Sequence, residues 1–215
     1  MSALSLDSSE PARPNRSVLL RRAFGLEWFT IAWNVVEGVV AIAAGLLANS
    51  VALIGFGLDS FVESSSAGIL VWRLKRETTG MDELHLERLE KKATRLVGVT
   101  LFILAAYIFL DATWSLFNQE RPQPSPLGIA LTSLSLLVMG FLARAKRRLG
   151  NELASPSLLA DATQTRACFW LSLVVLAGIG LNAAFGWWWA DPIAAIGMAF
   201  YILKEGLEAW DGDAH

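Results

Sequence analysis

The sequence predicts an all-α membrane protein with six transmembrane helices and both termini in the cytoplasm. Of its 215 residues, 54% are hydrophobic and only 18% are charged, and the mean hydropathy is +0.45. Soluble domains carry about a quarter charged residues. About 20 mostly apolar residues are needed for a helix to cross a bilayer. Six stretches reach that length, at about 27–48, 51–73, 96–117, 125–143, 158–185 and 187–208.

The basic residues predict the orientation of these spans. Lysine and arginine are enriched in loops on the cytoplasmic side of a membrane. Here they cluster before the first span, at 73–95 and at 144–148, with Lys204 near the end of the sixth span. The intervening connections hold only Arg121. With six spans all basic segments fall on one side, which supports the count. Tryptophans near the predicted span ends are typical of the membrane interface. They are Trp28, Trp72, Trp114, Trp187, Trp188 and Trp210.

The polar segments predict a simple domain organisation. Residues 1–20 are rich in proline and serine, which indicates a disordered cytoplasmic tail. Their apolar continuation is long enough to span, so they are not a signal peptide. The transmembrane domain is expected over 21–210, followed by a short tail at 211–215 and no C-terminal cytoplasmic domain. Charges at helical spacing in 74–95 predict that the third helix continues into the cytoplasm with a solvated face.

The second span carries two acidic residues, Asp59 and Glu63, near its middle. Residues four apart share one face of a helix. Two carboxylates so placed repel each other unless protons or a cation neutralise them, and a divalent metal is the natural occupant. The alternative is a pair of protonated carboxyl groups that hydrogen-bond to other helices, which is an expensive way to hold helices together.

The fifth span carries a polar stripe at intervals of three and four residues, formed by Asp161, Gln164, Thr165 and Cys168. A lone buried cysteine is usually a core residue, and a glutamine in a span usually bonds a neighbouring helix. The stripe becomes a candidate metal site only if it faces the acidic pair, and the opposite directions of the two spans permit that. Arg166 in the same span either snorkels to cytoplasmic water or pairs with a carboxylate.

Four other polar residues lie in or beside the predicted spans. Asn34 and Glu37 occupy neighbouring turns of the first span, and Asp111 lies in the outer half of the third. Glu37 and Asp111 are equally open to a role in a proton route and to a structural role. Asp191, followed by a proline, is explained by the start of the sixth helix.

The sequence does not predict an enzyme. His85 and His215 both fall outside the predicted spans, so no histidine is available there as a base or metal ligand. There is neither a zinc-protease helix motif nor a nucleophile elbow. The single cysteine excludes an intrachain disulfide.

Three segments of the chain resemble the cation diffusion facilitator family. The run 50–63 reads SVALIGFGLDSFVE, as in the family's second span, and 160–168 matches its fifth-span Ala-Asp-Ala motif. The run 189–206 shares the Asp-Pro-Ile-Ala start and Tyr-Ile-x-x-x-Gly pattern of its sixth span. The resemblance covers about 20–210. It implies six spans with cytoplasmic termini, export of zinc and related divalent ions, often against protons, and a homodimer.

Two departures separate the chain from the usual family pattern. The fifth-span histidine and aspartate of the family align with Gln164 and Cys168, and the chain ends at His215 without the usual C-terminal domain. Both features resemble a branch of small vesicular zinc transporters. The compact chain suggests a prokaryotic relative in the inner (cytoplasmic) membrane.

The expected function is therefore export of a divalent metal, zinc in the first place and cadmium in the second, by alternating access and in exchange for protons. Asp59, Glu63, Gln164 and Cys168 are the expected ligands, with Asp161 as a further candidate. A thiolate favours zinc, cadmium or copper(I) over magnesium or manganese. No permanent cofactor and no nucleic acid is expected. The alternative is a degenerate family member that binds metal or a membrane partner without transport.

Overall fold

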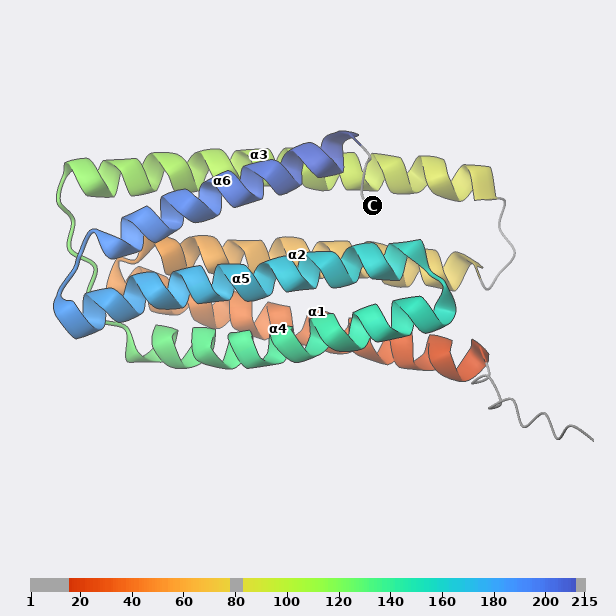
Figure 1. The fold of residues 1–215 in the computed structure, drawn as a ribbon. Helices are drawn as coiled ribbons and strands as arrows, with labels where there is room; N and C mark the ends of the chain where they lie inside the picture. Colours follow the sequence, from red (N-terminus) through yellow and green to blue (C-terminus); the bar gives the residue numbers. More distant parts are fainter. Residues whose placement is uncertain (1–15, 78–82, 212–215) are drawn as a thin grey trace, which may run out of the picture.

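A computed structural model describes residues 16–77 and 83–211 of the chain. This part contains six helices and no strand, which confirms that the protein is all-α (Figure 1). The six helices are α1 (Arg16–Ala48), α2 (Val51–Glu77), α3 (Glu83–Phe117), α4 (Pro126–Leu153), α5 (Pro156–Phe185) and α6 (Ala190–Asp211).

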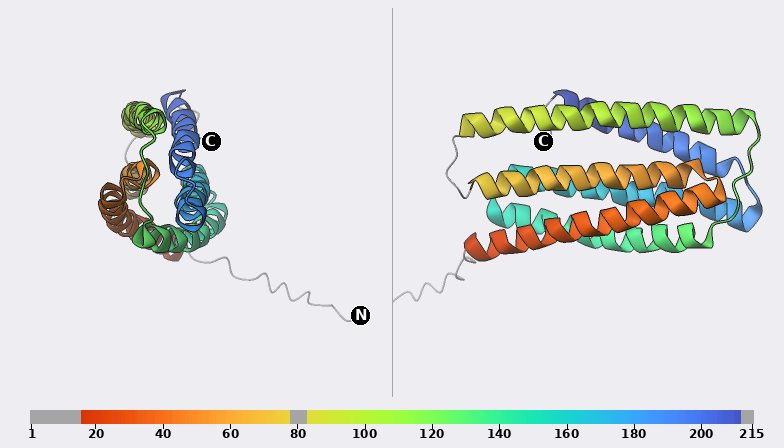
Figure 2. Two further views of the ribbon diagram at one scale, coloured as in Figure 1. Left: turned by 90° about the vertical axis from the view of Figure 1, so that its left-hand side faces the viewer. Right: turned by 180° about the vertical axis from the view of Figure 1, so that it is seen from behind.

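The helices run side by side in a bundle of three tight pairs. α1 packs against α2, α4 against α5 and α3 against α6. α2 and α5 also touch each other and α6, so they lie at the centre of the arrangement (Figures 1 and 2). The largest buried apolar cluster is formed by α1, α2, α3, α5 and α6, and Phe56, Ile108 and Met198 are among its fully buried members. The polar stripes predicted for the second and fifth spans therefore lie on the two central helices.

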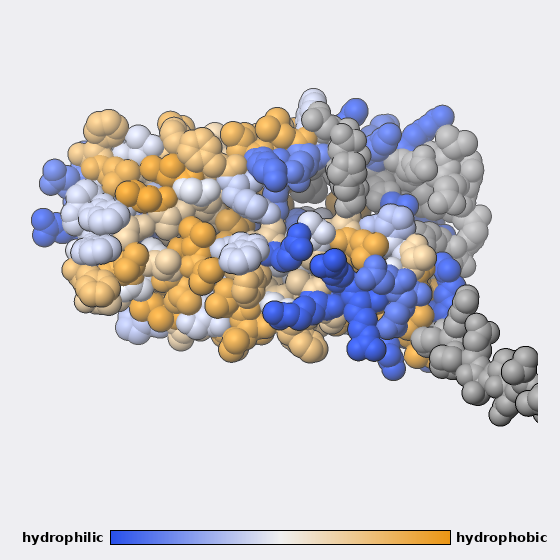
Figure 3. All heavy atoms as spheres, in the orientation of Figure 1, coloured by the Kyte–Doolittle hydropathy of each residue, from blue (hydrophilic) through white to orange (hydrophobic). Residues whose placement is uncertain are grey.

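The outer surface has the composition expected of a membrane protein. Four helical segments are long and apolar enough to cross a membrane: α1, residues 98–117 of α3, α4 and α5. α2 and α6 carry charged residues within their apolar stretches, among them Asp59 and Glu63 in α2 and Lys204 and Glu205 in α6. Many large apolar side chains are exposed, among them Leu47, Ile103 and Leu137. Hydrophobic residues cover most of the visible surface, and hydrophilic residues gather toward one end (Figure 3).

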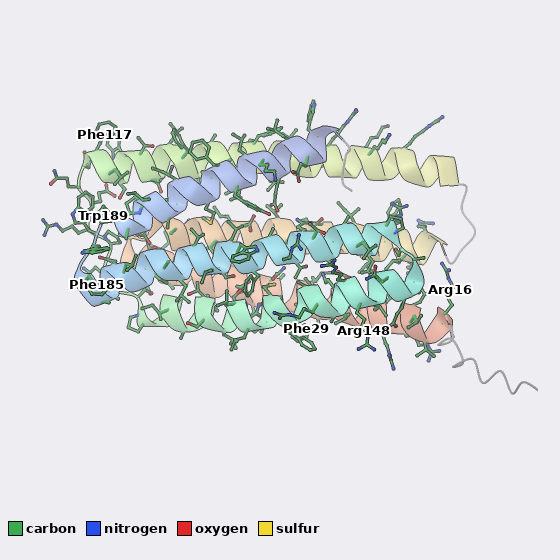
Figure 4. All side chains as sticks on the ribbon, in the orientation of Figure 1. Arg16, Phe29, Phe117, Arg148, Phe185 and Trp189 are labelled. Carbon is green, nitrogen blue, oxygen red and sulfur yellow. The ribbon has the colours of Figure 1, made fainter. Side chains whose placement is uncertain are left out.

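The two ends of the bundle differ in their side chains. Phe117, Phe185 and Trp189 lie at one end, which we call the aromatic end (Figure 4). Arg16 and Arg148 lie toward the other, which we call the basic end (Figure 4). This asymmetry is that expected for a protein that crosses a membrane in a fixed orientation.

Local sequence signals explain the helix boundaries around α4 and α5. Ser125 and Ser155 are N-caps whose side chains accept hydrogen bonds from the N–H groups of Gly128 and Leu158. A proline follows each cap, at a position where its missing N–H is harmless. α5 ends at Gly186, which has a φ of 68°, a left-handed conformation that glycine adopts without strain.

Several helices extend further at the basic end than the apolar stretches indicate, and α1, α3 and α4 show this most clearly. α1 begins at Arg16, so residues 16–20, expected in a tail, are helical and Leu19 is buried. α4 continues to Leu153, so 144–148 is helical and not a loop. α3 begins at Glu83, in line with the predicted extension. Hydropathy marks only the part of a helix that contacts hydrocarbon, whereas the backbone continues beyond it. The rest of the expected tail, residues 1–15, and the residues after 211 lie outside the described chain.

Candidate metal site

Asp59 and Glu63 are both in the interior of the bundle, one turn apart on α2. Their exposed fractions are 4% and 2%. The serines beside them are largely occupied by their own helix, since the Oγ atoms of Ser60 and Ser64 donate to the carbonyls of Phe56 and Ser60. The two carboxylates therefore form a buried acidic pair with few local donors.

Part of the polar stripe of α5 lies beside this acidic pair. The thiol of Cys168 donates to Oδ2 of Asp59 at a distance of 3.8 Å. Thr165, one turn away, is fully buried, and the electrostatic neighbours of Glu63 include Thr165 and Cys168. Gln164 is only half-buried, and its Oε1 accepts a hydrogen bond of 2.8 Å from Ser66 of α2. Cys168 thus lies beside Asp59, while Gln164 contacts α2 one turn further toward the basic end.

Asp161 has a different partner, which the sequence analysis missed. Its Oδ2 accepts from Nζ of Lys146 at 2.5 Å, and the same ammonium donates to Oε2 of Glu27 at 3.0 Å. All three side chains are buried, and Lys146 has no exposed surface. They join α4, α5 and α1. In this conformation Asp161 is bound by Lys146 in an ion triad, and both residues also act electrostatically on Glu63 of the acidic pair.

Two sequence signals for this triad were available. Glu27 begins a stripe of buried polar residues at helical spacing that continues through Thr30, Asn34 and Glu37. Lys146 lies on the face of α4 that also buries Met139, Leu142 and Leu149. Neither residue was singled out because of where the expected spans end. Glu27 is the first residue of the expected first span, and Lys146 follows the expected fourth span, in a segment expected to be a loop.

Glu37 belongs to the surroundings of the acidic pair, and Asp111 does not. Oε2 of Glu37 accepts a hydrogen bond of 3.3 Å from Ser60, and its charge acts on Asp59. Asp111 is partly exposed on α3, where its electrostatic neighbours are Tyr107 and Glu120. A further acidic residue, Glu205 of α6, acts electrostatically on Asp59 and Glu63 and was not singled out in the sequence.

Asp191 has a structural role that differs from the one expected. It lies in the first turn of α6, but its carboxylate accepts hydrogen bonds from Ser50 Oγ at 2.5 Å and from the N–H of Ala52 at 3.4 Å. These donors are at the start of α2, where a carboxylate is stabilised by free N–H groups and the helix dipole. Asp191 therefore ties the beginnings of α2 and α6 together.

Arg166 points away from the site. It is exposed on α5 and lines a pocket between α4 and α5 together with Arg144 and Arg147. Of the two alternatives in the sequence analysis, pairing with a carboxylate is not seen within the described residues.

The interior around the acidic pair contains polar atoms without hydrogen-bond partners among the described residues. They include Oε1 of Glu37, Oε1 of Glu63, Oγ1 of Thr165 and both amide atoms of Asn34. Leaving a buried polar atom unpaired costs about 1–3 kcal/mol, and such groups are rare in native proteins. These atoms belong to residues of α1, α2 and α5. Yet within the described residues no three His, Cys, Asp or Glu side chains are grouped closely enough to hold a metal ion.

Buried carboxylates among long apolar helices are costly, and in membrane proteins they usually mark a functional site. The comparison with known proteins agrees. The chain matches the cation efflux transmembrane domain over residues 28–210, and it belongs to that family. The family consists of transporters and not of enzymes.

The relatives of the chain are proteins of the same kind. It is 30% identical over 168 residues to the uncharacterized transporter sll1263 of Synechocystis sp., covering 77% of this chain and 54% of that protein. It is 25% identical over 184 residues to the magnetosome protein MamB of Magnetospira sp., covering 84% and 62%. It is 23% identical over 185 residues to the manganese efflux system protein MneS of Bacillus subtilis, covering 85% and 62%. The chain thus spans between half and two thirds of the length of these relatives.

Proposed function

We propose that this protein exports a divalent metal ion, zinc in the first place, from the cytoplasm in exchange for protons. In this proposal all six helices span the membrane, both termini are cytoplasmic, and the protein lies in a prokaryotic inner membrane as a homodimer. The transported ion binds between α2 and α5, to Asp59, Glu63, Cys168 and Gln164. The observation that carries the proposal is the 3.8 Å contact between Cys168 Sγ and Asp59 Oδ2.

That separation suits two ligands of one zinc ion. Zinc binds thiolate sulfur at about 2.3 Å and carboxylate oxygen at about 2.0–2.2 Å, so two such ligands of a tetrahedral ion lie about 3.6 Å apart. Cys168 and Asp59 already lie near this distance, on different helices. Glu63, the next acidic residue along the same face of α2, has one carboxylate oxygen without a hydrogen bond among the described residues.

One of the remaining ligands has to move before the ion is fully enclosed. Gln164 must exchange its hydrogen bond with Ser66 for the metal, whereas Glu63 already has Cys168 among its electrostatic neighbours. This movement accounts for the lack of a three-ligand group in the described chain. A small shift between α2 and α5 would assemble the site in one state and open it in another, as alternating access requires.

Exchange for protons follows from the charge of the site. Asp59 and Glu63 lie together in a buried site, and Glu37 and Glu205 add to their negative field. Ligands must be deprotonated to bind metal, so binding releases protons, and departure of the metal leaves charges that protons neutralise. The same groups therefore hold metal from one side and protons from the other.

The choice of ion depends on Cys168. MneS, one of the relatives, is named for manganese efflux. A thiolate favours zinc or cadmium over manganese, whose usual ligands are carboxylate, carbonyl and water oxygens. We therefore place zinc first for this chain, with cadmium as the second candidate.

A second candidate function is metal binding without transport. The absence of a preassembled three-ligand group in the described residues favours it, as does glutamine in place of the family's fifth-span histidine. Uptake of zinc into proteoliposomes, with and without a pH gradient, separates the two functions. We expect gradient-dependent uptake by the wild type and a loss of at least about tenfold in Asp59→Asn, since even indirect partners of a metal contribute that much.

The matched control is Glu208→Gln, which removes an exposed carboxylate of α6 and should leave uptake unchanged. Absence of zinc, cadmium and manganese uptake by folded wild-type protein would favour the non-transporting function. Unchanged uptake by Asp59→Asn would show that the ion passes elsewhere.

A further inference from the structure

The outer surface of the bundle holds a second polar feature, distinct from the interior site. A pocket of about 540 Å³ lies between α4 and α5, and its lining includes Arg144, Arg147 and Arg166. Phe169, Trp170 and Asn151 also contribute, and no acidic residue lines it. Hydrophilic side chains gather over the corresponding halves of α4 and α5 (Figure 3). The lining thus carries three positive charges, which would repel a metal cation.

The three arginines keep most of their hydrogen-bonding capacity for a ligand. Neither Arg147 nor Arg166 forms an ion pair with a described residue, and Arg144 donates from Nη1 to the carbonyl of Gly140 at 2.7 Å. The neighbouring Arg148 is different, because it pairs with Glu152 at 3.1 Å. A guanidinium has five N–H donors and matches the oxygens of a phosphate group. The pocket therefore offers convergent donors for an anion.

The depth of the pocket is that of the lipid headgroups. Arg166 is 19 residues before Phe185, and Arg144 is 18 residues after Pro126, both counted from helix ends near the aromatic end. At about 1.5 Å per residue these separations are roughly 28 and 27 Å. The hydrocarbon core of a bilayer is about 30 Å thick. The guanidinium groups consequently reach the headgroup region at the basic end of the bundle.

The aromatic residues that line the pocket also fit the level of the lipid headgroups. Trp170 lies one turn from Arg166 toward the aromatic end and is exposed over 57% of its surface. Tryptophan is enriched where hydrocarbon meets headgroups, because its ring is amphipathic. The apolar surface on the side of the aromatic end matches the acyl chains of a lipid molecule. The cationic surface nearer the basic end matches the phosphate of the same lipid.

We propose that this pocket binds the headgroup of an anionic phospholipid. Basic pockets between transmembrane helices on the cytoplasmic side are known to hold such headgroups. Because α5 also carries Cys168 on its opposite face, a lipid bound here would contact a helix that contributes to the interior site. The inference does not depend on which ion is transported.

The test is native mass spectrometry of the full chain, equilibrated in micelles with phosphatidylglycerol and phosphatidylcholine. We expect the wild type to retain phosphatidylglycerol preferentially. The triple variant Arg144→Gln, Arg147→Gln, Arg166→Gln should show a weaker preference for phosphatidylglycerol. The preference should fall about fivefold per arginine, which is around a hundredfold in all. The corresponding triple arginine-to-lysine variant should fall between the wild type and the glutamine variant, because it keeps the charge but loses the forked donors of the guanidinium groups.

The matched control removes three arginines that lie outside the pocket, by Arg21→Gln, Arg22→Gln and Arg148→Gln, and should change the preference by less than about threefold. Equal retention by wild type and the pocket glutamine variant would overturn the proposal. So would an equal loss in the control, or a lysine variant as weak as the glutamine variant. Displacement of the lipid by inorganic phosphate at matched concentration would show that the pocket recognises free phosphate instead.

Discussion

At the scale of single residues, the proposed metal site consists of side chains that meet between α2 and α5. Asp59 and Cys168 are 109 positions apart in the chain but in contact in the bundle. Gln164, one turn from Cys168, accepts a hydrogen bond from Ser66 through its side-chain oxygen. An amide oxygen is a weaker zinc ligand than an imidazole nitrogen, so in the proposed site Gln164 limits how tightly zinc binds.

We predict that Gln164→His tightens zinc binding by about tenfold or more, because imidazole is a preferred zinc ligand. Competition with a zinc-binding dye measures the change in Kd. Thr163→His is the matched control, since its side chain is exposed on the same helix and should not alter the affinity of the interior site. An equal gain in both variants, or none in Gln164→His, would place position 164 outside the metal site.

Sequence patterns located the acidic pair and the facing stripe because helical spacing alone puts Asp59 with Glu63, and Gln164 with Cys168, on one face. The same reasoning could not assign Asp161. Its partner Lys146 lies on another helix, and only the packing of α4 against α5 shows that the two charges meet. Pairing between helices depends on the rotation of each helix about its axis, which spacing within one helix does not contain.

At the scale of helices, the ion triad of Lys146, Asp161 and Glu27 links α4, α5 and α1. The three side chains are buried and belong to α4, α5 and α1. Each partner would be an uncompensated buried charge without the others. The triad is therefore expected to fix the relative position of these helices near the basic end.

We predict that Lys146→Met lowers the free energy of unfolding by about 3–5 kcal/mol, because it leaves two buried carboxylates without their cation. Unfolding in mixed micelles measures the loss. Arg148→Met, which breaks an exposed pair with Glu152, should lower it by no more than about 1 kcal/mol. Adding Glu27→Gln and Asp161→Asn to Lys146→Met should recover much of the stability; a further loss instead would contradict the triad.

Close packing between α1 and α2 gives a second prediction at this scale. A Cβ atom added at Gly57 would lie 2.8 Å from the carbonyl oxygen of Gly38 and 2.7 Å from Cγ1 of Ile42. A Cβ at Gly68, on the same helix, would have no heavy atom within 4 Å. Gly57→Ala should therefore destabilise the protein by about 1–3 kcal/mol, while Gly68→Ala should change stability by less than about 1 kcal/mol. Thermal unfolding in detergent compares them; similar shifts in Tm would refute close contact at Gly57.

The helices could be predicted from hydropathy, but their lengths could not. The expected limits agree closely with the structure at the aromatic end, where Ser125 and Gly186 provide capping signals. At the basic end charged residues continue the helices without a break in backbone conformation. That is why Lys146, a buried side chain, was placed in a loop.

At the scale of the whole molecule, the six-helix bundle brings two surfaces of different chemistry to the opposite faces of α5. The inner faces of α2 and α5 hold the acidic pair and the thiol, and the outer faces of α4 and α5 hold the arginine pocket. Family membership indicated the overall fold from motifs alone. The arginine pocket was not foreseen, because it combines residues of two helices whose mutual rotation is set by tertiary packing.

In the proposed site, Asp59 of α2 and Cys168 of α5 bind the same ion. Zinc K-edge X-ray absorption on the intact protein, loaded with one zinc per chain, tests it most directly. We predict one sulfur neighbour at about 2.3 Å with the remaining neighbours oxygen or nitrogen at about 2.0–2.2 Å. The sulfur should vanish in Cys168→Ser, and stoichiometric zinc should be lost in Asp59→Asn. A wild-type spectrum without sulfur, or a bound zinc that is unaffected by Asp59→Asn, would contradict the account.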